Sequence, residues 1–357
     1  MEFNDVRLQY EALRDEIDSA IGQVLIGGRY ILGPSMLAFE DEFARYCRAA
    51  IGIAVASGMD ALSIALEALG IRPGDEVLVP AVSAAATAMA VTSVKAKPIF
   101  VDISPGDFNI DPVQALDRKT SRTRAVVPVH LYGMPARLKE IVEAGVPVLE
   151  DAGQAHGSDA RWGRCGSFGV AAAFSFYPTK NLGAYGDAGM IVTSDAAIAE
   201  RSRLLRNYGQ REHLSSEILG RNSRLDELHA AVLRVKLRTL DQWNRRRREI
   251  ARIYRKALGE LPLGMQAETG ESNYHLFVIT TAERDKLRAH LASRGIPALV
   301  HYPIPLHRQK AFREFSPEPC PHADLLCSRV LSLPIHAFLS NGEAERVIDG
   351  VRSFFGR

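Results

Sequence analysis

Seven short apolar runs between residues 51 and 193 constrain the fold of this chain more than any other sequence feature. Each is apolar nearly throughout instead of alternating with polar residues, and helical stretches such as 61–69 separate them. Such runs are typical of strands buried on both faces of a mostly parallel sheet. The sequence therefore predicts a large α/β domain with a seven-stranded sheet. The expected strands are 51–56, 76–79, 98–101, 125–129, 147–149, 171–176 and 190–193.

The pattern differs on both sides of this region. Residues 8–26 and 36–46 have helical periodicity, and a long helical tract covers residues 225–258. Beyond it, strand-like and helical segments alternate to the end of the chain. A chain of 357 residues is longer than one hydrophobic core usually serves. We therefore expect a large α/β domain with N-terminal helices over residues 1–240, and a smaller α+β domain over residues 241–357 that begins with the long helix.

Composition argues against several classes of partner. The net charge is +2, which is too close to neutral to favour binding to nucleic acid or to an acidic membrane surface. The basic run Arg245–Arg248 is therefore interpreted as a solvated helix face. No apolar run approaches the roughly 20 residues of a transmembrane helix, so no membrane partner is expected.

The compartment is predicted from the N-terminus and the cysteines. The first residues lack the basic and apolar regions of a signal peptide. The four cysteines are scattered and form no CxxC pair, so free thiols and no metal are expected. Both features favour a cytoplasmic protein.

The main candidate for chemistry is Lys180. It follows an apolar run and precedes a loop of small residues, where a lysine can be held beside a cofactor and reached by a substrate. Asp151 ends another apolar run about 30 residues upstream. Gln154 follows one turn later, where it could reach the hydroxyl of a cofactor ring. A lysine that forms an imine and an aspartate that holds a pyridinium nitrogen are what pyridoxal phosphate chemistry requires. The alternatives are an exposed lysine for Lys180 and a structural ion pair or cap for Asp151.

A phosphate site is indicated where a strand leads through Ser57 and Gly58 into a helix. A helix N-terminus offers free N–H groups to an anion, and glycine allows close approach. Ser57 and Asp60 are equally consistent with plain helix caps. The Ser175 hydroxyl, five residues before Lys180, is placed to reach the same phosphate. His156 either contacts cofactor or substrate or is a core histidine.

In ordered motifs over nearly its whole length, the chain resembles the sugar aminotransferases of the DegT–StrS group, which belong to the fold-type-I class of pyridoxal phosphate enzymes. The motifs include Ser57-Gly58-x-Asp60-Ala-Leu62, Pro128-Val-His-Leu-Tyr-Gly133, Glu150-Asp-Ala-x-Gln154, Ser175-Phe-Tyr-Pro-x-Lys180-Asn-Leu-Gly183, Gly220-x-Asn222-Ser-Arg224-Leu-Asp226 and His301-Tyr-Pro303.

The resemblance implies roles for individual residues. Lys180 is expected to bind the cofactor covalently, and Asp151 to pair with its ring nitrogen. Gly58, Met59 and Ser175 are expected to hold the phosphate. Asn222 is expected to reach the cofactor phosphate of a neighbouring subunit, which implies a homodimer with shared active sites.

Four residues depart from the family pattern. Met59 stands where threonine is usual, so one phosphate-binding hydroxyl is absent. Ala84 stands where an aromatic side chain usually stacks on the cofactor ring, so looser cofactor binding is expected unless another side chain fills the gap. Thr179 replaces a usual glycine, and His229 replaces a usual glutamine. None of these changes removes a group that performs the chemistry.

The resemblance also indicates the substrates. The family transfers an amino group from an amino acid, usually glutamate, to a keto group on a nucleotide-linked sugar. The segments at Pro128–Gly133 and Lys180–Asp187 favour members that act at a 3-keto position; C4-keto sugars and keto-cyclitols are the alternatives. Arg224 is expected to hold the donor carboxylate with its planar fork, or else forms a surface ion pair. Tyr302 and His307 either contact substrate or pack in the core or an interface. The candidate substrate contacts are Arg29, Tyr30, Tyr185, Arg224, His301, Tyr302 and His307.

Three other functions fit the sequence less well. Sugar dehydratases on this scaffold replace the lysine with histidine or add cysteines for an iron–sulfur cluster, and this chain does neither. A non-catalytic regulatory protein would have no need of Lys180, Asp151 and Asn222. A nicotinamide dehydrogenase needs a G-x-G-x-x-G motif after a strand, which is absent.

Overall fold

All seven predicted strands form, but their hydrogen bonds make two ladders. The computed structural model describes the whole chain except residues 161–162, 213, 316–317 and 357. A four-stranded sheet has the order β1-β9-β8-β5, and a three-stranded sheet has the order β3-β2-β4. Their bounds are β1 (Ile51–Val55), β2 (Glu76–Pro80), β3 (Lys97–Val101), β4 (Thr123–Val126), β5 (Leu149–Asp151), β8 (Ala171–Ser175) and β9 (Gly189–Thr193).

The expectation of one continuous seven-stranded sheet needs correction at the β4–β5 boundary. There the chain forms isolated parallel bridges, Val126 to Val148 and Val129 to Asp151. Pro128 and Pro147 lie within this boundary and accept hydrogen bonds through their carbonyls. Because proline has no N–H to donate, a regular ladder is interrupted there. The pairing is otherwise mostly parallel, and β9 is antiparallel to both of its neighbours.

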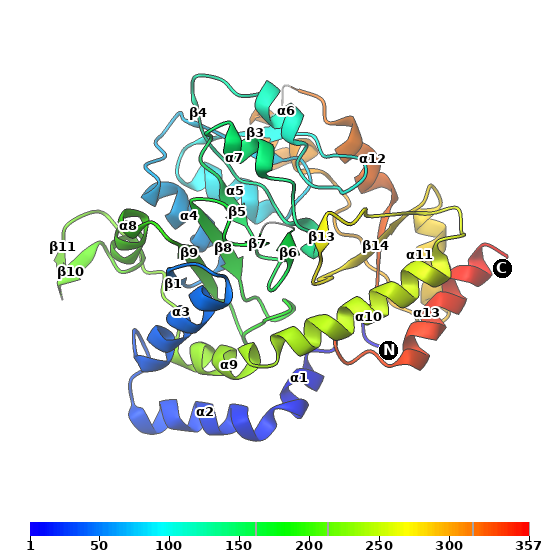
Figure 1. Cartoon of the computed structure of the whole chain (residues 1–357), viewed down its shortest axis with the longest axis horizontal. Helices are drawn as coiled ribbons and strands as arrows, with labels where there is room; N and C mark the ends of the chain where they lie inside the picture. The colour runs from blue at the N-terminus through cyan, green and yellow to red at the C-terminus, as the bar shows by residue number, and fades with distance from the viewer. Residues whose placement is uncertain (161–162, 213, 316–317, 357) are drawn as a thin grey trace.

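Strand β8 shows why these strands lack apolar–polar alternation. Ala171 and Ala173 belong to a core cluster that includes Ile64 of α4 (Gly58–Ala68). The residues that alternate with them along the strand, Ala172 and Phe174, belong to a second cluster that includes Phe43 of α3 (Pro34–Tyr46). Both faces of the strand are buried, so both need apolar side chains. Figure 1 shows α4 and α3 on either side of this sheet.

The helices of the large sheet region surround these clusters. The predicted N-terminal helix is divided at Leu13 into α1 (Arg7–Ala12) and α2 (Arg14–Gly27), and α2 ends at Gly28 with a φ of 65°. α4 packs against α5 (Ala85–Ser93) and α8 (Ala196–Arg206). α9 (Glu227–Leu237) packs against α2 and α3. Shorter helices are α6 (Pro112–Asp117), α7 (Lys139–Glu143) and the 3₁₀ turn η1 (Leu131–Gly133).

The long helical tract at 225–258 forms two helices, α9 and α10 (Leu240–Leu258). α10 packs against α13 (Asn341–Phe354), which also contacts α11 (Arg284–Ser293) (Figure 1). A separate core cluster draws nearly all of its members from residues 250–351. It lies beside the antiparallel sheet β12 (Gly264–Met265), β14 (Phe277–Thr280) and β15 (Val330–Leu333).

The remaining elements are short and connect these units. They are β6 (Asp159–Ala160), β7 (Gly163–Arg164) and β13 (Gly270–Glu271) in one small sheet, the hairpin β10 (Gln210–Glu212) and β11 (Ser215–Ser216), the 3₁₀ turns η2 (Leu306–Arg308) and η3 (Lys310–Phe315), and α12 (Pro321–Arg329).

The interpretation of Arg245–Arg248 as a solvated helix face is wrong for most of the run. Arg247 is only 2% exposed and donates to the carbonyl oxygens of Tyr274 and Ile335, at 3.2 and 2.9 Å. Arg246 and Arg248 have protein partners too, the Leu339 carbonyl and the Glu271 carboxylate. These arginines connect α10 to the C-terminal region, so most of the run makes contacts within the protein.

The structure also describes the helices in relation to a membrane and the state of the four cysteines. Within the described part of the chain, no helix has the length and apolar character needed to span a bilayer. Cys47, Cys165, Cys320 and Cys327 are all buried free thiols, as expected from their spacing.

Candidate active site

One pocket brings Lys180 and Asp151 together at the carboxyl ends of the strands. Asp151 is the last residue of β5, and Lys180 lies in the loop that follows the neighbouring strand β8. Both are partly exposed because they face the pocket. Five other predicted cofactor residues line the same space: Gly58, Met59, Ala84, Gln154 and Ser175.

The start of α4 forms one wall of this pocket. Ser57 is the N-cap, and its hydroxyl accepts a hydrogen bond from the Asp60 N–H at 3.1 Å. A Cβ at Gly58 would lie 2.5 Å from the Cβ of Ser175, so only glycine fits between α4 and β8. The hydrogen bond from Asp60 confirms the capping alternative for Ser57. The close approach of Gly58 to Ser175 places the start of α4 beside the Ser175 hydroxyl. This is the arrangement that binds a phosphate.

The Asp151 carboxylate is held from two directions. The Thr87 hydroxyl donates to Oδ2 at 2.7 Å, and the Gly153 N–H donates to Oδ1 at 3.2 Å. Burial raises the pKa of Asp151, while these hydrogen bonds and the Lys180 charge oppose the rise. A cation held against this carboxylate would favour its charged form, which fits the pyridinium partner expected from the sequence.

Sequence reasoning did not identify Thr87. It lies in the first turn of α5, and its hydroxyl is also 2.7 Å from that of Ser83. The available signal was the spacing of two hydroxyl residues four apart at a helix start, just after the end of β2. Ser83 precedes the N-cap Ala84 and Thr87 lies in the first turn, so the spacing can bring the two hydroxyls together, but it does not say that they meet Asp151.

The pKa of Lys180 is lower than that of an exposed lysine. Burial lowers the pKa of its ammonium group to about 8, and the negative charge of Asp151 partly opposes this effect. A larger fraction of its amine is therefore neutral at physiological pH than for an exposed lysine. A neutral amine is the form that attacks a carbonyl carbon.

Gln154 connects the pocket to the C-terminal region. Its Oε1 accepts from the Tyr132 N–H at 2.7 Å, and its Nε2 donates to the Tyr302 hydroxyl at 3.2 Å. His301, the residue before Tyr302, has its Nδ1 2.9 Å from the Ser332 hydroxyl. Tyr302 is thus joined to the pocket through Gln154, although it does not itself line the pocket.

Several predicted contacts lie outside this pocket. Arg29 donates to the Leu32 carbonyl at 2.6 Å, and Arg224 donates to the Asn207 side chain at 3.2 Å. His307 is buried, and its Nε2 lies 3.3 Å from the Asp324 carboxylate. The predicted residues not among the pocket lining are Arg29, Tyr30, Tyr185, Asn222, Arg224, His301, Tyr302 and His307.

His156 is a core histidine in this structure. Its ring lies 5.4 Å from that of Phe174 and 5.6 Å from that of Phe176, and the residue is fully buried. Burial lowers its pKa to about 3, so the ring is neutral. The aromatic contacts account for the position of the ring, and contact with cofactor or substrate stays a prediction.

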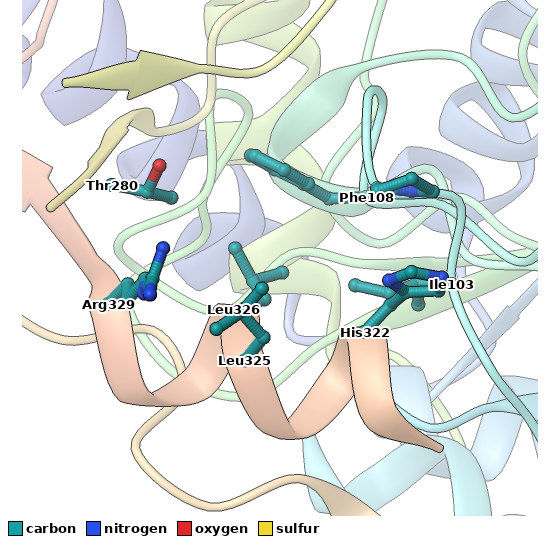
Figure 2. A pocket seen from close by; sticks show the side chains of 8 residues that line it. Ile103, Phe108, Thr280, His322, Leu325, Leu326 and Arg329 are labelled. Atoms are coloured by element: carbon teal, nitrogen blue, oxygen red, sulfur yellow. The ribbon is translucent and has the colours of Figure 1, made fainter. Parts of the chain in front are cut away.

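A different pocket lies between α12 and the loop after β3 (Figure 2). Its lining includes Ile103, Phe108, Leu325 and Leu326, with Arg329 at one end. It offers neither a lysine nor a carboxylate. Among the described residues, no cluster of His, Cys, Asp or Glu could hold a metal. The chemistry is therefore assigned to the pocket with Lys180.

The residues of that pocket fit pyridoxal phosphate. Asp151 offers a carboxylate for a ring cation, and Lys180 offers an amine for the cofactor carbonyl carbon. Gly58 leaves a space beside Ser175 that any Cβ would fill. A fold of this architecture, with an amine, an acid and a phosphate cradle at the strand ends, defines a pyridoxal phosphate enzyme.

Comparison with known proteins places the chain more narrowly. Residues 11–352 match the profile of the DegT/DnrJ/EryC1/StrS aminotransferase family. The chain is 48% identical to dTDP-3-amino-3,4,6-trideoxy-alpha-D-glucose transaminase of Streptomyces venezuelae, over 99% of this chain and 96% of that one. It is 40% identical to the pleiotropic regulatory protein of Geobacillus stearothermophilus, over 98% and 97% of the two chains.

Solved structures agree with this placement. The crystal structure of S. venezuelae DesV in complex with a ketimine intermediate aligns with a TM-score of 0.97 and 47% identity, over 100% of this chain and 98% of that one. Bacillus subtilis NtdA with bound cofactor PMP aligns with a TM-score of 0.90 and 30% identity, over 96% and 82% of the two chains. This chain belongs to the DegT/DnrJ/EryC1/StrS aminotransferase family, and it is a pyridoxal-phosphate-dependent sugar aminotransferase.

Proposed function

We propose that this protein transfers an amino group from an amino acid, with L-glutamate as the expected donor, to the 3-keto group of a nucleotide-linked sugar. The observation that carries the proposal is the convergence of Lys180, Asp151 and the α4 N-terminus on one pocket. The 3-position is supported by the names of relatives that are 48%, 41% and 41% identical to this chain, each of which specifies a 3-amino product or a 3-aminotransferase. Two of these names specify dTDP-linked sugars, which makes dTDP the first nucleotide to test.

Each pocket residue has a proposed task. Bound pyridoxal phosphate supplies an electron sink for the carbon that carries the amino group. Lys180 would hold the cofactor through its carbonyl carbon. Once released, its amine would carry a proton from the donor α-carbon to the cofactor carbonyl carbon, and in the second half-reaction from that carbon to the sugar carbon that receives the amino group. Asp151 would hold the ring nitrogen in its protonated form. Thr87 and the Gly153 N–H fix the Asp151 carboxylate in place.

The phosphate is assigned to the first turn of α4. The backbone N–H groups at Gly58 and Met59, together with the Ser175 hydroxyl, would bind it. Gln154 is proposed to face the cofactor ring while it holds Tyr302. Ala84 leaves one side of this space without an aromatic ring.

We further propose a homodimer in which Asn222 completes the neighbouring site. Asn222 is exposed and lies outside the pocket of its own subunit. In the same region Leu214 is 81% exposed and Leu219 is 95% exposed, and such apolar surface favours burial against a partner. Arg29, Tyr30, Tyr185, Arg224, His301, Tyr302 and His307 remain proposed substrate contacts. The division of the chain near residue 240 is proposed because one core cluster is drawn from residues 250–351.

The decisive experiment is a substrate screen. The purified holoenzyme is incubated with glutamate and a set of 3-keto and 4-keto sugars linked to dTDP or UDP, together with keto-cyclitols, and 2-oxoglutarate is measured. Selective turnover of a 3-keto sugar would support the proposal. Preference for a 4-keto sugar or a keto-cyclitol would transfer the assignment to that substrate class.

The dimer is tested separately with mixed subunits. A Lys180→Ala subunit and an Asn222→Ala subunit are each expected to be weakly active alone. A mixed dimer regains one intact site, so partial activity should return. Absence of rescue in a verified mixed dimer would contradict shared sites.

A second candidate function follows from the names of relatives. The 46% identical erythromycin biosynthesis sensory transduction protein and the 40% identical pleiotropic regulatory protein carry regulatory names. A regulator would bind the cofactor and a sugar without releasing 2-oxoglutarate. The same screen separates the two functions if cofactor spectra are recorded alongside turnover.

A further inference from the structure

A second enclosed lysine lies beside the loop that carries Lys180. Lys236 on α9 is only 1% exposed, and no salt bridge involves it in the described part of the chain. Its Nζ donates to the Gly183 carbonyl at 2.8 Å and lies 4.1 Å from the centre of the Tyr185 ring. Removing an ammonium group from water without a carboxylate partner is costly. The cost of burying Lys236 therefore points to a role for its contacts with this loop.

The loop itself is tightly wound. The Lys180 N–H donates to the Tyr177 carbonyl and the Ala184 N–H donates to the Phe176 carbonyl, each at 2.8 Å. A Cβ at Gly183 would lie 2.4 Å from the Pro178 carbonyl oxygen, so the chain has no spare room at this turn. A change in the position of the Gly183 carbonyl would therefore be transmitted to Lys180, three residues earlier.

One face of α9 contacts the loop at two places. His229 precedes Lys236 by two helical turns, so both project from the same side of the helix. A Cβ at Gly186 would lie 2.7 Å from the His229 ring, which shows how closely the loop approaches α9 there. Lys236 contacts the loop at Gly183 and Tyr185, so α9 supports the segment on both sides of Tyr185.

The Tyr185 ring is positioned without the use of its hydroxyl. Lys236 lies over the ring, and the Tyr10 ring meets it at 77° with centroids 6.4 Å apart. Tyr185 remains 42% exposed, and within the described residues its hydroxyl makes no hydrogen bond. Burial lowers the pKa of Lys236 to about 8, so the group is mostly cationic at neutral pH, as a cation–π contact requires. The free hydroxyl is thus available to a ligand.

We infer that Lys236 is a positioning residue for the transfer reaction: its ammonium group fixes the Gly183 carbonyl and the Tyr185 ring, and so sets how the loop presents Lys180 and the Tyr185 hydroxyl to the sugar. This inference rests on the proposed function, because it assigns Tyr185 to the sugar substrate. Methionine matches the length of the lysine side chain but can neither donate to the carbonyl nor hold the ring by charge. Arginine retains the charge.

The test compares Lys236→Met, Lys236→Arg and Tyr185→Leu with the wild-type holoenzyme. Lys139→Met is the matched control, because the Lys139 side chain is 68% exposed and lies on α7. Hydrogen exchange of residues 181–186 reports on the loop without any turnover. Steady-state kinetics with the ketosugar reports on the site, and the cofactor spectrum shows that loading is intact.

In Lys236→Met, exchange in 181–186 should become faster, and KM for the sugar should rise by about tenfold with a smaller change in kcat. In a Tyr185→Leu background, Lys236→Met should add less than about twofold to KM, because the contact with the Tyr185 ring is already absent there. The hydrogen bond to the Gly183 carbonyl is still lost, so exchange in 181–186 should still become faster. Unchanged exchange and KM in Lys236→Met, or fully additive effects on KM in the double variant, would overturn the inference.

Two controls keep the outcomes separate. If Lys236→Met does not fold, Tyr185→Leu and Lys236→Arg carry the test: faster loop exchange and a higher KM in Tyr185→Leu, with a milder effect in Lys236→Arg, would support the inference, and wild-type behaviour in both would overturn it. If the wild-type protein turns over no ketosugar, the proposed function fails. The exchange measurement still decides whether Lys236 holds the loop.

Discussion

Lys180 and Lys236 differ in what surrounds them, although burial lowers the pKa of each to about 8. Lys180 faces a pocket that also contains Asp151 and Ser175. Lys236 is packed against a carbonyl oxygen and an aromatic ring. A lowered pKa therefore indicates enclosure and does not by itself identify a lysine that reacts. Open space beside the amine, shared with an acid and an anion cradle, is what distinguishes Lys180.

Replacing each lysine with methionine tests this difference between Lys180 and Lys236 most directly. Lys180→Met should lower turnover by at least about 10³-fold, because the amine that binds the cofactor and moves protons is removed. Lys236→Met should retain most of kcat. Borohydride treatment of the wild-type enzyme should attach the cofactor to Lys180, as mapped by peptide mass spectrometry. Attachment to Lys236 would reverse the assignment.

The next largest effect is expected at Asp151. Asp151→Asn removes the charge that would hold a protonated ring nitrogen, and turnover should fall by about 10²- to 10³-fold. Covalent attachment through Lys180 should persist, as seen in the absorbance spectrum. Thr87→Val should reproduce a smaller part of this loss, since it removes the hydrogen bond at 2.7 Å but leaves the charge. Near-normal rates in Asp151→Asn would show that Asp151 is structural.

The two lysines also show what sequence can and cannot predict. Lys180, Asp151 and Ser175 were predictable because each lies at or just after the end of an apolar run, and the ends of parallel strands meet at one edge of a sheet. Lys236 and Thr87 lie on helices, and their roles depend on which helix face meets which loop. That information comes from packing between distant segments and leaves no local pattern.

Other differences have the same origin. The strands themselves were predictable from their apolar runs. The interruption between β4 and β5 depends on Pro128 and Pro147, which lie in the two segments that pair with each other there. Arg247 reads as one more basic residue in a run, yet it binds carbonyl oxygens from two distant segments. Both features are set by tertiary contacts.

The pH dependence of cofactor loading tests the lowered pKa of Lys180. Below its pKa of about 8, Lys180 is protonated and its nitrogen cannot attack a carbonyl carbon. The neutral fraction, and with it the rate at which apo-enzyme binds pyridoxal phosphate covalently, should rise about tenfold per pH unit up to pH 8 and then level off. Stopped-flow absorbance measures this rate. A rise that continues to pH 10 would show that the site leaves the pKa of Lys180 near that of an exposed lysine.

The smallest expected effect concerns the part of the pocket wall that Ala84 forms. Ala84 lines the pocket and offers no aromatic surface. Ala84→Phe should tighten cofactor binding by about two- to twelvefold, which corresponds to the 0.5–1.5 kcal/mol of a stacked pair beyond its buried area. Equilibrium dialysis of apo-enzyme measures the change, with Ala84→Ser as a control that adds bulk without a ring. An unchanged dissociation constant would mean that another side chain already covers the ring, and weaker binding would mean that the space beside Ala84 is too narrow for a phenyl group.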